Sequence, residues 1–365
     1  MLAEVALAFL KLGLFAFGGP AAHIAMMEDE FVTRRKWVTP EHFLDLVGAT
    51  NLIPGPNSTE MTMHLGYERA GWRGLLVAGA CFIGPAVTLT GMLAWFYVTY
   101  GSLPQVAPFF AGIKPAVIAI IAGALYKLGG KAVKTRQLGL VAALVFTAVL
   151  AGCPQIPALL AGGLLAMLWL RKRAPSNLTA ALLLLSTRVA KAATQVSNPS
   201  LFLFFLKIGS ILYGSGYVLV AFLEEGLVQQ LGWLTQAQLL DAIAIGQFTP
   251  GPVLSTATFI GFLVNGPSGA LSATVGIFLP SFLFVWLLNP LIPRMRKSVW
   301  LSAFLDGVNV SALALMATVV VQLSLSTLVT GPAWIILLVA LVGLRFEVNS
   351  AWLVLAGALL GRLLL

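Results

Sequence analysis

The chain has 365 residues, of which 59% are hydrophobic and 10% are charged, and its mean hydropathy is +0.94. Because soluble domains carry about 25% charged residues, this composition excludes an ordinary soluble protein and predicts an all-α polytopic membrane protein. The net charge of +9 comes from short basic clusters between apolar stretches. Such clusters are typical of cytoplasmic membrane loops and do not indicate a nucleic-acid partner.

The first 25 residues predict a retained membrane helix. They carry Glu4 before the apolar run and Lys11 within it, and they lack the basic start and small-residue cleavage pattern of a signal peptide. Since a helix needs about 20 apolar residues to cross the hydrocarbon core, we expect about ten spans in all. They cover approximately residues 3–25, 74–100, 106–128, 138–152, 154–170, 200–222, 269–290, 302–324, 330–345 and 350–365.

The tripeptide Pro-Gly-Pro occurs at residues 54–56 and again at residues 250–252, 196 positions later. At the same offset, Lys11 falls on Lys207 and Glu28 on Glu224, and after a one-residue deletion the match continues at an offset of 195. The sequence therefore predicts two copies of one membrane unit, at 1–170 and 200–365. Residues 171–199, which are rich in basic residues and proline, form the expected cytoplasmic linker, and 178–193 within it predict an amphipathic surface helix or a short span.

Each Pro-Gly-Pro interrupts an apolar segment, at about 41–66 and 237–262. Two prolines two residues apart do not fit a regular helix, and each remaining arm reaches only halfway across a bilayer. We therefore predict two re-entrant helical hairpins whose tips lie near the membrane midplane. The alternative is a purely structural kink.

Basic residues predict that the two copies have opposite orientations in the membrane. Residues 34–36 and Arg69 and Arg73 flank the first hairpin, whereas the equivalent positions of the second copy carry no positive charge. Conversely, the basic residues 294–297 have no basic counterparts in the first copy. By the positive-inside rule, the chain is an inverted-topology repeat, an arrangement typical of secondary transporters.

The helix that follows each Pro-Gly-Pro begins at mid-membrane depth, where its free N–H groups and positive dipole end favour an anion. The side chains around the two tips are small, hydroxylic or amide-bearing, and we expect them to bind the substrate. They are Asn51, Pro54, Gly55, Pro56, Asn57, Ser58 and Thr59 in the first copy and Gln247, Pro250, Gly251, Pro252, Ser255 and Thr256 in the second, together with Gly18 and Gly19 in the first helix.

Charged residues inside a membrane segment are costly and are therefore candidates for function. Lys11, Lys207 and Lys114 lie in predicted spans, and we expect them to contribute to substrate binding, with snorkelling to the interface as the alternative. The candidates for ion coupling are Glu28, Glu60 and Glu224, although the first and last of these could also be interfacial.

With these motifs, the chain resembles the long, two-domain form of the chromate ion transporter family. The resemblance rests on residues 17–20, on 51–56 with their partner 247–252, and on the glycine-rich stretch 66–74, and it extends over both halves. It implies a multi-pass protein of the inner (plasma) membrane that exports chromate, recognises sulfate as an analogue and uses the proton gradient or membrane potential. From the residues alone, the prediction is an anion-preferring carrier that works by alternating access.

The sequence leaves several alternatives open. A passive anion channel, a carrier for a different small anion and a homodimeric assembly all fit the same pattern. No catalytic motif, metal-ligand spacing or phosphate-binding loop is found, so we expect neither an enzyme nor a cofactor. The expected partners are a small inorganic oxyanion and the lipid bilayer.

Overall fold

The computed structural model describes residues 1–17, 20–101, 103–170, 196–213, 216–288 and 298–364. The first half contains α1 (Leu2–Phe15), α2 (Pro20–Glu28), η1 (Asp29–Arg34), α3 (Pro40–Thr50), α4 (Asn57–Tyr100), α5 (Ala107–Ala132), α6 (Arg136–Leu150) and α7 (Gln155–Leu170). The second half contains α9 (Asn198–Ile211), η2 (Gly216–Val218), α10 (Leu219–Leu223), η3 (Glu224–Gln230), α11 (Gln236–Phe248), η4 (Val253–Ser255), α12 (Thr256–Leu288), α14 (Val299–Thr327), α15 (Gly331–Arg345) and α16 (Ser350–Leu364).

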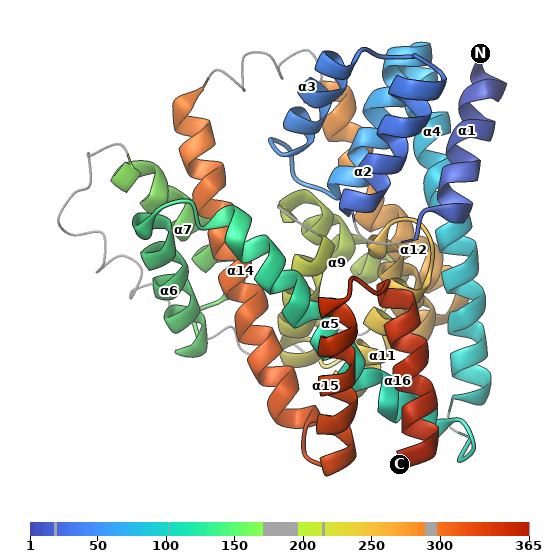
Figure 1. The fold of residues 1–365 in the computed structure, drawn as a ribbon, viewed down its shortest axis with the longest axis vertical. Coiled ribbons are helices and arrows are strands. Elements are labelled where there is room, and N and C mark those ends of the chain that lie inside the picture. The colour runs from blue at the N-terminus through green and yellow to red at the C-terminus, as the bar shows by residue number, and fades with distance from the viewer. Residues whose placement is uncertain (18–19, 102, 171–195, 214–215, 289–297, 365) are drawn as a thin grey trace.

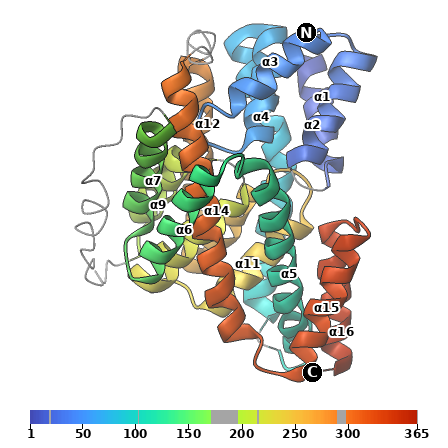
Figure 2. The same cartoon turned by 60° about the vertical axis from the view of Figure 1, so that its left-hand side comes forward.

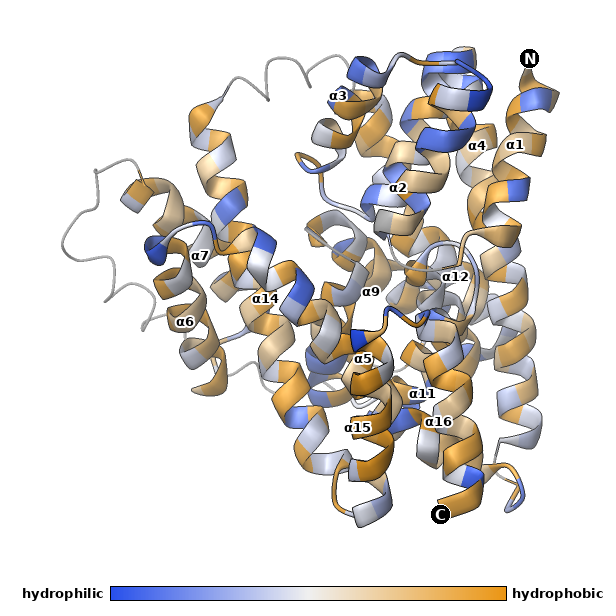
Figure 3. Ribbon diagram, in the orientation of Figure 1, coloured by the Kyte–Doolittle hydropathy of each residue, from blue (hydrophilic) through white to orange (hydrophobic). Residues whose placement is uncertain are grey.

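The described residues form helices and no strands, as the composition predicts for a membrane protein. Among them, α4, α5, α12 with the preceding η4, and α14 are long and apolar enough to cross a membrane. Figure 3 shows mostly apolar residues along α15 and α16, which lie side by side at one edge of the molecule. Most of the predicted linker, including the proposed surface helix at 178–193, lies outside the described residues.

The predicted spans 3–25 and 200–222 are each interrupted. The first divides into α1 and α2, because α1 ends at Phe15 and Pro20, which has no N–H to continue a helix, begins the next one. Glu4 at the start of α1 accepts hydrogen bonds from Trp37, which follows η1, and from Arg69. The two ends of the α1–η1 stretch therefore lie close together, at the same end of the molecule. In the second copy, α9 ends at Ile211 and helical structure resumes at Gly216.

The long helices α4 and α12 each contain a sharp bend. Gly71 and Gly266 have φ angles of +62°, which only glycine adopts at low cost, and they turn the chain back along itself. The backbones of Gly66 and Gly74 consequently approach so closely that a Cβ on either would meet the other's carbonyl group. The short arm after each Pro-Gly-Pro therefore lies against the long arm that follows it.

Each half contributes helices that pack against the other half. Gly112 of α5 lies against Gly357 and Gly361 of α16, and Gly307 of α14 lies against Gly162 of α7. Figures 1 and 2 show these pairs, with α14 beside α7 on one side and α5 beside α15 and α16 on the other. Glycine at these positions lets the backbones approach closely, which is how helices associate in a membrane without a hydrophobic driving force.

Candidate functional site

The two Pro-Gly-Pro tips are buried and join two helices each. The first tip connects α3 to α4, and the second connects α11 to η4 and α12. Gly55 has a φ angle of +144° and Gly251 one of +90°, a region that favours glycine, while the flanking prolines leave the chain no way to continue as a helix. The sequence Pro-Gly-Pro is therefore sufficient to explain both breaks.

The two tips form matching hydrogen bonds across the molecule. The Gly55 N–H donates to the Leu212 carbonyl oxygen at 2.6 Å, and the Gly251 N–H donates to the Ala16 carbonyl oxygen at 2.9 Å. Ala16 and Leu212 follow α1 and α9, at the interruptions described above, and they are 196 positions apart, as are the two glycines. Each tip thus pairs with the interrupted helix of the other half, and four breaks in helical structure meet at the centre.

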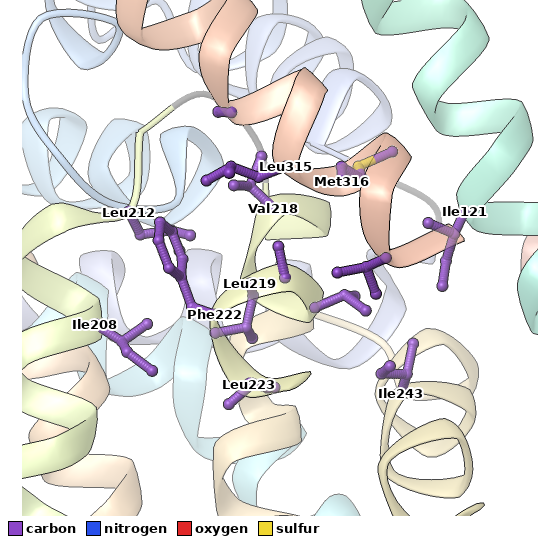
Figure 4. Close-up of a cluster of buried hydrophobic side chains, with 14 of the residues drawn as sticks. Ile121, Ile208, Leu212, Val218, Leu219, Phe222, Leu223, Ile243, Leu315 and Met316 are labelled. Atoms are coloured by element: carbon purple, nitrogen blue, oxygen red, sulfur yellow. The ribbon is translucent and has the colours of Figure 1, made fainter. Parts of the chain in front are cut away.

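The segment that follows α9 touches both tips. Its Leu212 pairs with the first tip, and a Cβ placed on Gly216 would lie 3.6 Å from Val253 of the second. The Tyr217 hydroxyl donates to the Gln247 side-chain oxygen at 3.4 Å. Figure 4 shows the apolar side of this segment, where Leu212 and the side chains of η2 and α10 pack near α14. Apolar packing therefore fixes one side of the segment that joins the tips.

Polar side chains close the first tip from both arms. The Asn57 amide nitrogen donates to the Asn51 side-chain oxygen at 2.7 Å, and the Asn51 amide nitrogen donates to the Val47 carbonyl oxygen at 3.0 Å. Asn51 is exposed, whereas Ser58 and Thr59 are buried. The Thr59 hydroxyl has no hydrogen-bond partner among the described residues. The first tip therefore offers a buried hydroxyl beside the start of α4.

The second tip has fewer amides and a different arrangement. The Thr249 and Ser255 hydroxyls lie 3.4 Å apart across the tip, and the Thr256 hydroxyl donates to the Val253 carbonyl oxygen at 2.8 Å. Gln247 is 7% exposed, and its amide nitrogen has no hydrogen-bond partner in the part of the chain that the structure describes. A buried amide donor without a partner costs free energy unless a ligand or water meets it, so Gln247 is a candidate ligand-binding residue.

Glu60 lies in the first turn of α4 and points back at the first tip. A Cβ on Gly55 would collide with the Glu60 Oε1 atom and would lie 2.6 Å from the Ser281 hydroxyl of α12. The Glu60 side chain is completely buried, and within the described ranges neither carboxyl oxygen has a hydrogen-bond partner. The Ser281 hydroxyl also lacks one. An acidic group therefore lies directly beside the proposed anion site.

None of the three predicted lysines has a described contact with either Pro-Gly-Pro tip. Lys11 and Lys207 are exposed on the outer side of α1 and α9, and Lys207 lies within electrostatic range of Glu225. Lys114 extends toward Asp241 of α11, with 3.8 Å between its Nζ atom and the Asp241 Oδ1 atom. Asp241 also accepts a 2.8 Å hydrogen bond from the Tyr97 hydroxyl. The structure thus joins α4, α5 and α11 through a polar cluster that we call the Asp241 cluster.

The remaining predicted residues divide into exposed, buried and undescribed positions. Glu28 is exposed, whereas Glu224 is buried and accepts hydrogen bonds of 2.9 and 2.8 Å from the Gln229 amide. Gly18 and Gly19 lie outside the described residues. Within the described ranges, no group of three His, Cys, Asp or Glu side chains is placed to hold a metal ion.

Several polar residues at the centre are not identifiable from the motifs alone. Ser281 follows Pro280 as Ala86 follows Pro85 in the first copy, so only a comparison of the copies draws attention to its hydroxyl. His23 is buried, with its Nε2 atom 3.1 Å from the Ala16 carbonyl oxygen. Tyr217 and Thr249 carry no pattern that would indicate a site.

The central groups are suited to hold a small anion with several oxygen atoms. The first N–H groups of α4 have no carbonyl one turn earlier within that helix, and Thr59, Gln247 and Ser281 add buried polar groups. Such donors match a tetrahedral oxyanion better than a cation, which requires convergent oxygen ligands.

The sequence is similar to those of known transport proteins. The family profile described as "Chromate transporter" matches residues 3–168 and 199–362. A probable chromate transport protein of Synechococcus elongatus is 35% identical over 92% of this chain and 87% of its own length. Chromate transport proteins of Cupriavidus metallidurans and Pseudomonas aeruginosa are each 33% identical, over 98% and 87% of this chain and over 92% and 79% of their own lengths.

No solved structure matches the chain. The family profile covers almost all of both halves, and the curated relatives match over most of their own lengths. The names of these relatives describe transport proteins. The chain belongs to the chromate transporter family.

Proposed function

We propose that the protein is a secondary active transporter of an oxyanion, with chromate as the exported substrate and sulfate as a recognised analogue. It acts in the inner (plasma) membrane by alternating access. The names of its relatives support chromate as the substrate. The chemistry of the central donors supports an oxyanion of this size and geometry.

The observation that carries the proposal is the matching pair of hydrogen bonds at the centre. Gly55 and Gly251 each donate to an interrupted helix of the other half, which is the contact pattern expected if the halves are related by a pseudo-two-fold axis. Such an axis in the membrane plane produces inverted repeats whose broken helices meet at a substrate site. The opposite distribution of basic loops between the copies supports the same relation.

In this proposal, residues 41–66 and 237–262 are the two re-entrant hairpins. The α1–α2 and α9–α10 stretches also break near the centre, whereas, within the described residues, each of the other eight predicted spans corresponds to an uninterrupted helix. The first copy, 1–170, and the second, 200–365, are connected by the cytoplasmic segment 171–199. The anion is held between the tips by the groups around Asn51, Thr59 and Gln247.

The test is transport by the purified protein in liposomes. Chromate and sulfate flux are measured with an imposed membrane potential, with an imposed pH gradient and with neither, using protein-free liposomes as the control. We expect chromate to move against its concentration gradient when one of the gradients is present. The absence of flux of either anion under every gradient would refute an oxyanion transporter, and purely downhill flux that is insensitive to pH would indicate a passive channel.

A further inference from the structure

The structure singles out one of the three acidic coupling candidates. Glu28 is exposed to solvent or lipid, and the Glu224 carboxyl is held by two hydrogen bonds from Gln229. Glu60 and Glu224 are both completely buried, but of the three only Glu60 lacks a hydrogen-bond partner among the described residues. Its Oε1 atom occupies the space beside Gly55, at the tip that precedes the α4 N-terminus.

An ionised Glu60 would be poorly stabilised in this position. A buried carboxylate is tolerated only when it is paired with a cation, hydrogen-bonded or protonated. Within the described ranges Glu60 forms no ion pair, and the neutral Ser281 hydroxyl of α12 borders the same space beside Gly55. The nearby titratable groups are Tyr213, on the segment after α9, and His64, one turn further along α4.

A bound dianion makes the ionised form still less favourable. The anion would bind at the N-terminus of α4, and Glu60 lies in the first turn of that helix. Like charges at short distance in a medium of low dielectric constant repel each other strongly. None of the three predicted lysines offers a compensating charge, since Lys11 and Lys207 are exposed and Lys114 extends toward Asp241. A proton on Glu60 removes the repulsion and converts the carboxylate into a hydroxyl donor.

We propose that Glu60 is the proton-binding site of the carrier and that it is protonated whenever the oxyanion is bound. The empty carrier exchanges this proton with solvent, so that in alkaline solution Glu60 is ionised until the oxyanion binds. Proton and anion binding are then linked reciprocally: each increases the affinity for the other. One proton accompanies each dianion, so the loaded step moves one negative charge instead of two. This inference rests on the proposed transport function.

The first experiment measures proton uptake when chromate is added to the detergent-solubilised protein in weakly buffered alkaline solution, where chromate itself stays a dianion. We expect the wild-type protein to take up about one proton per bound anion, because binding requires protonation of one carboxyl. Glu60→Gln should bind chromate without proton uptake and with an affinity that no longer falls as pH rises. Glu60→Asp, which retains the acid, should retain uptake.

Two control variants distinguish the effect of Glu60 from that of other titratable residues. Glu41→Gln replaces an exposed acid at the start of α3 and should behave as the wild type. His64→Gln should leave proton uptake intact, and its loss in that variant would assign the proton to His64 instead. Equal proton uptake by the wild type and Glu60→Gln, or chromate binding to the wild type without any uptake, would overturn the proposal.

The second experiment repeats the measurement as transport in liposomes. An imposed pH gradient alone should drive chromate accumulation by the wild type but not by Glu60→Gln, whereas a membrane potential should drive both. If Glu60→Gln responds to the pH gradient as the wild type does, Glu60 is not the coupling site although transport itself stands. If the wild type neither binds nor moves chromate, the transport function fails and the coupling proposal fails with it.

Discussion

At the scale of single residues, the centre of the protein is defined by polar atoms that have no partner within the described chain. Gln247 and Glu60 are the two that differ most in chemistry, since one offers an amide donor and the other a carboxyl. Asn51 is the first-copy equivalent of Gln247, and Thr256 is the second-copy equivalent of Glu60. Both side chains already donate hydrogen bonds to carbonyl oxygens. The two copies therefore do not contribute equally to the site.

Replacing Gln247 by methionine tests its role as a donor. Gln247→Met keeps the length of the side chain and removes the buried amide, so chromate affinity should fall by about tenfold, the equivalent of about 1.4 kcal/mol for a lost hydrogen bond to a charged group. Equilibrium binding of chromate to the purified variant measures this. The control is Gln105→Met, at an exposed position between α4 and α5, and equal affinities in both variants would remove Gln247 from the site.

At the scale of elements, the Asp241 cluster connects α11 to α4 and α5. Asp241 is almost completely buried, and its carboxyl meets the Tyr97 hydroxyl and the Lys114 ammonium group. The equivalent residue of the first copy, Asp45, is exposed. A buried polar connection thus anchors α11, the first arm of the proposed second hairpin. The equivalent position on α3, in the proposed first hairpin, is not buried.

Removing the tyrosine hydroxyl should weaken this anchor. Tyr97→Phe leaves the aromatic packing against Phe110 and Phe259 in place but deletes the hydrogen bond to a buried carboxylate, which contributes about 1.5 to 3 kcal/mol. We expect a lower thermal unfolding midpoint in detergent. Tyr100→Phe, at an exposed position one turn further along α4, should have the wild-type midpoint, and the same midpoint for Tyr97→Phe would contradict the role of the cluster.

Sequence patterns were informative for helices whose termini follow local rules. Thr39 and Thr235 cap α3 and α11 through their side-chain oxygens, and Pro-Gly-Pro follows both helices, so local signals account for where α3 and α11 begin and end. The interruptions after α1 and α9 were missed, because apolar composition does not distinguish a continuous span from two short helices. The pairing of Asp241 with Lys114 depends on tertiary packing over more than 100 residues, which no local pattern encodes.

At the scale of the whole molecule, several helices of each half pack against helices of the other half. The packing of α5 on α16 and of α14 on α7 accompanies the matching bonds of Gly55 and Gly251 at the centre. The offset of 195 to 196 residues could be read from the sequence, and the exchanged pairing could not, because equivalent glycines allow close packing within a half as well as between halves.

Labelling of introduced cysteines tests the opposite orientation of the halves. Trp72→Cys and Ser268→Cys place a thiol at exposed positions just after the bends at Gly71 and Gly266, in a background in which Cys81 and Cys153 are replaced by serine. A membrane-impermeant thiol reagent added to intact cells should label only Ser268→Cys. Both should react in permeabilised cells, and labelling of the two from the same side in intact cells would refute the inversion.

The bonds from Gly55 to Leu212 and from Gly251 to Ala16 also bear on biosynthesis. When residues 1–170 have entered the membrane, the backbone groups of Ala16 and Gly55 still lack the partners that only the later half supplies. An unsatisfied peptide group in the lipid core is costly. Water therefore remains at these backbone groups of the first half until the second half has been inserted and supplies their partners. The ribosome therefore delivers two incomplete halves, and folding is completed only when the C-terminal half has been made.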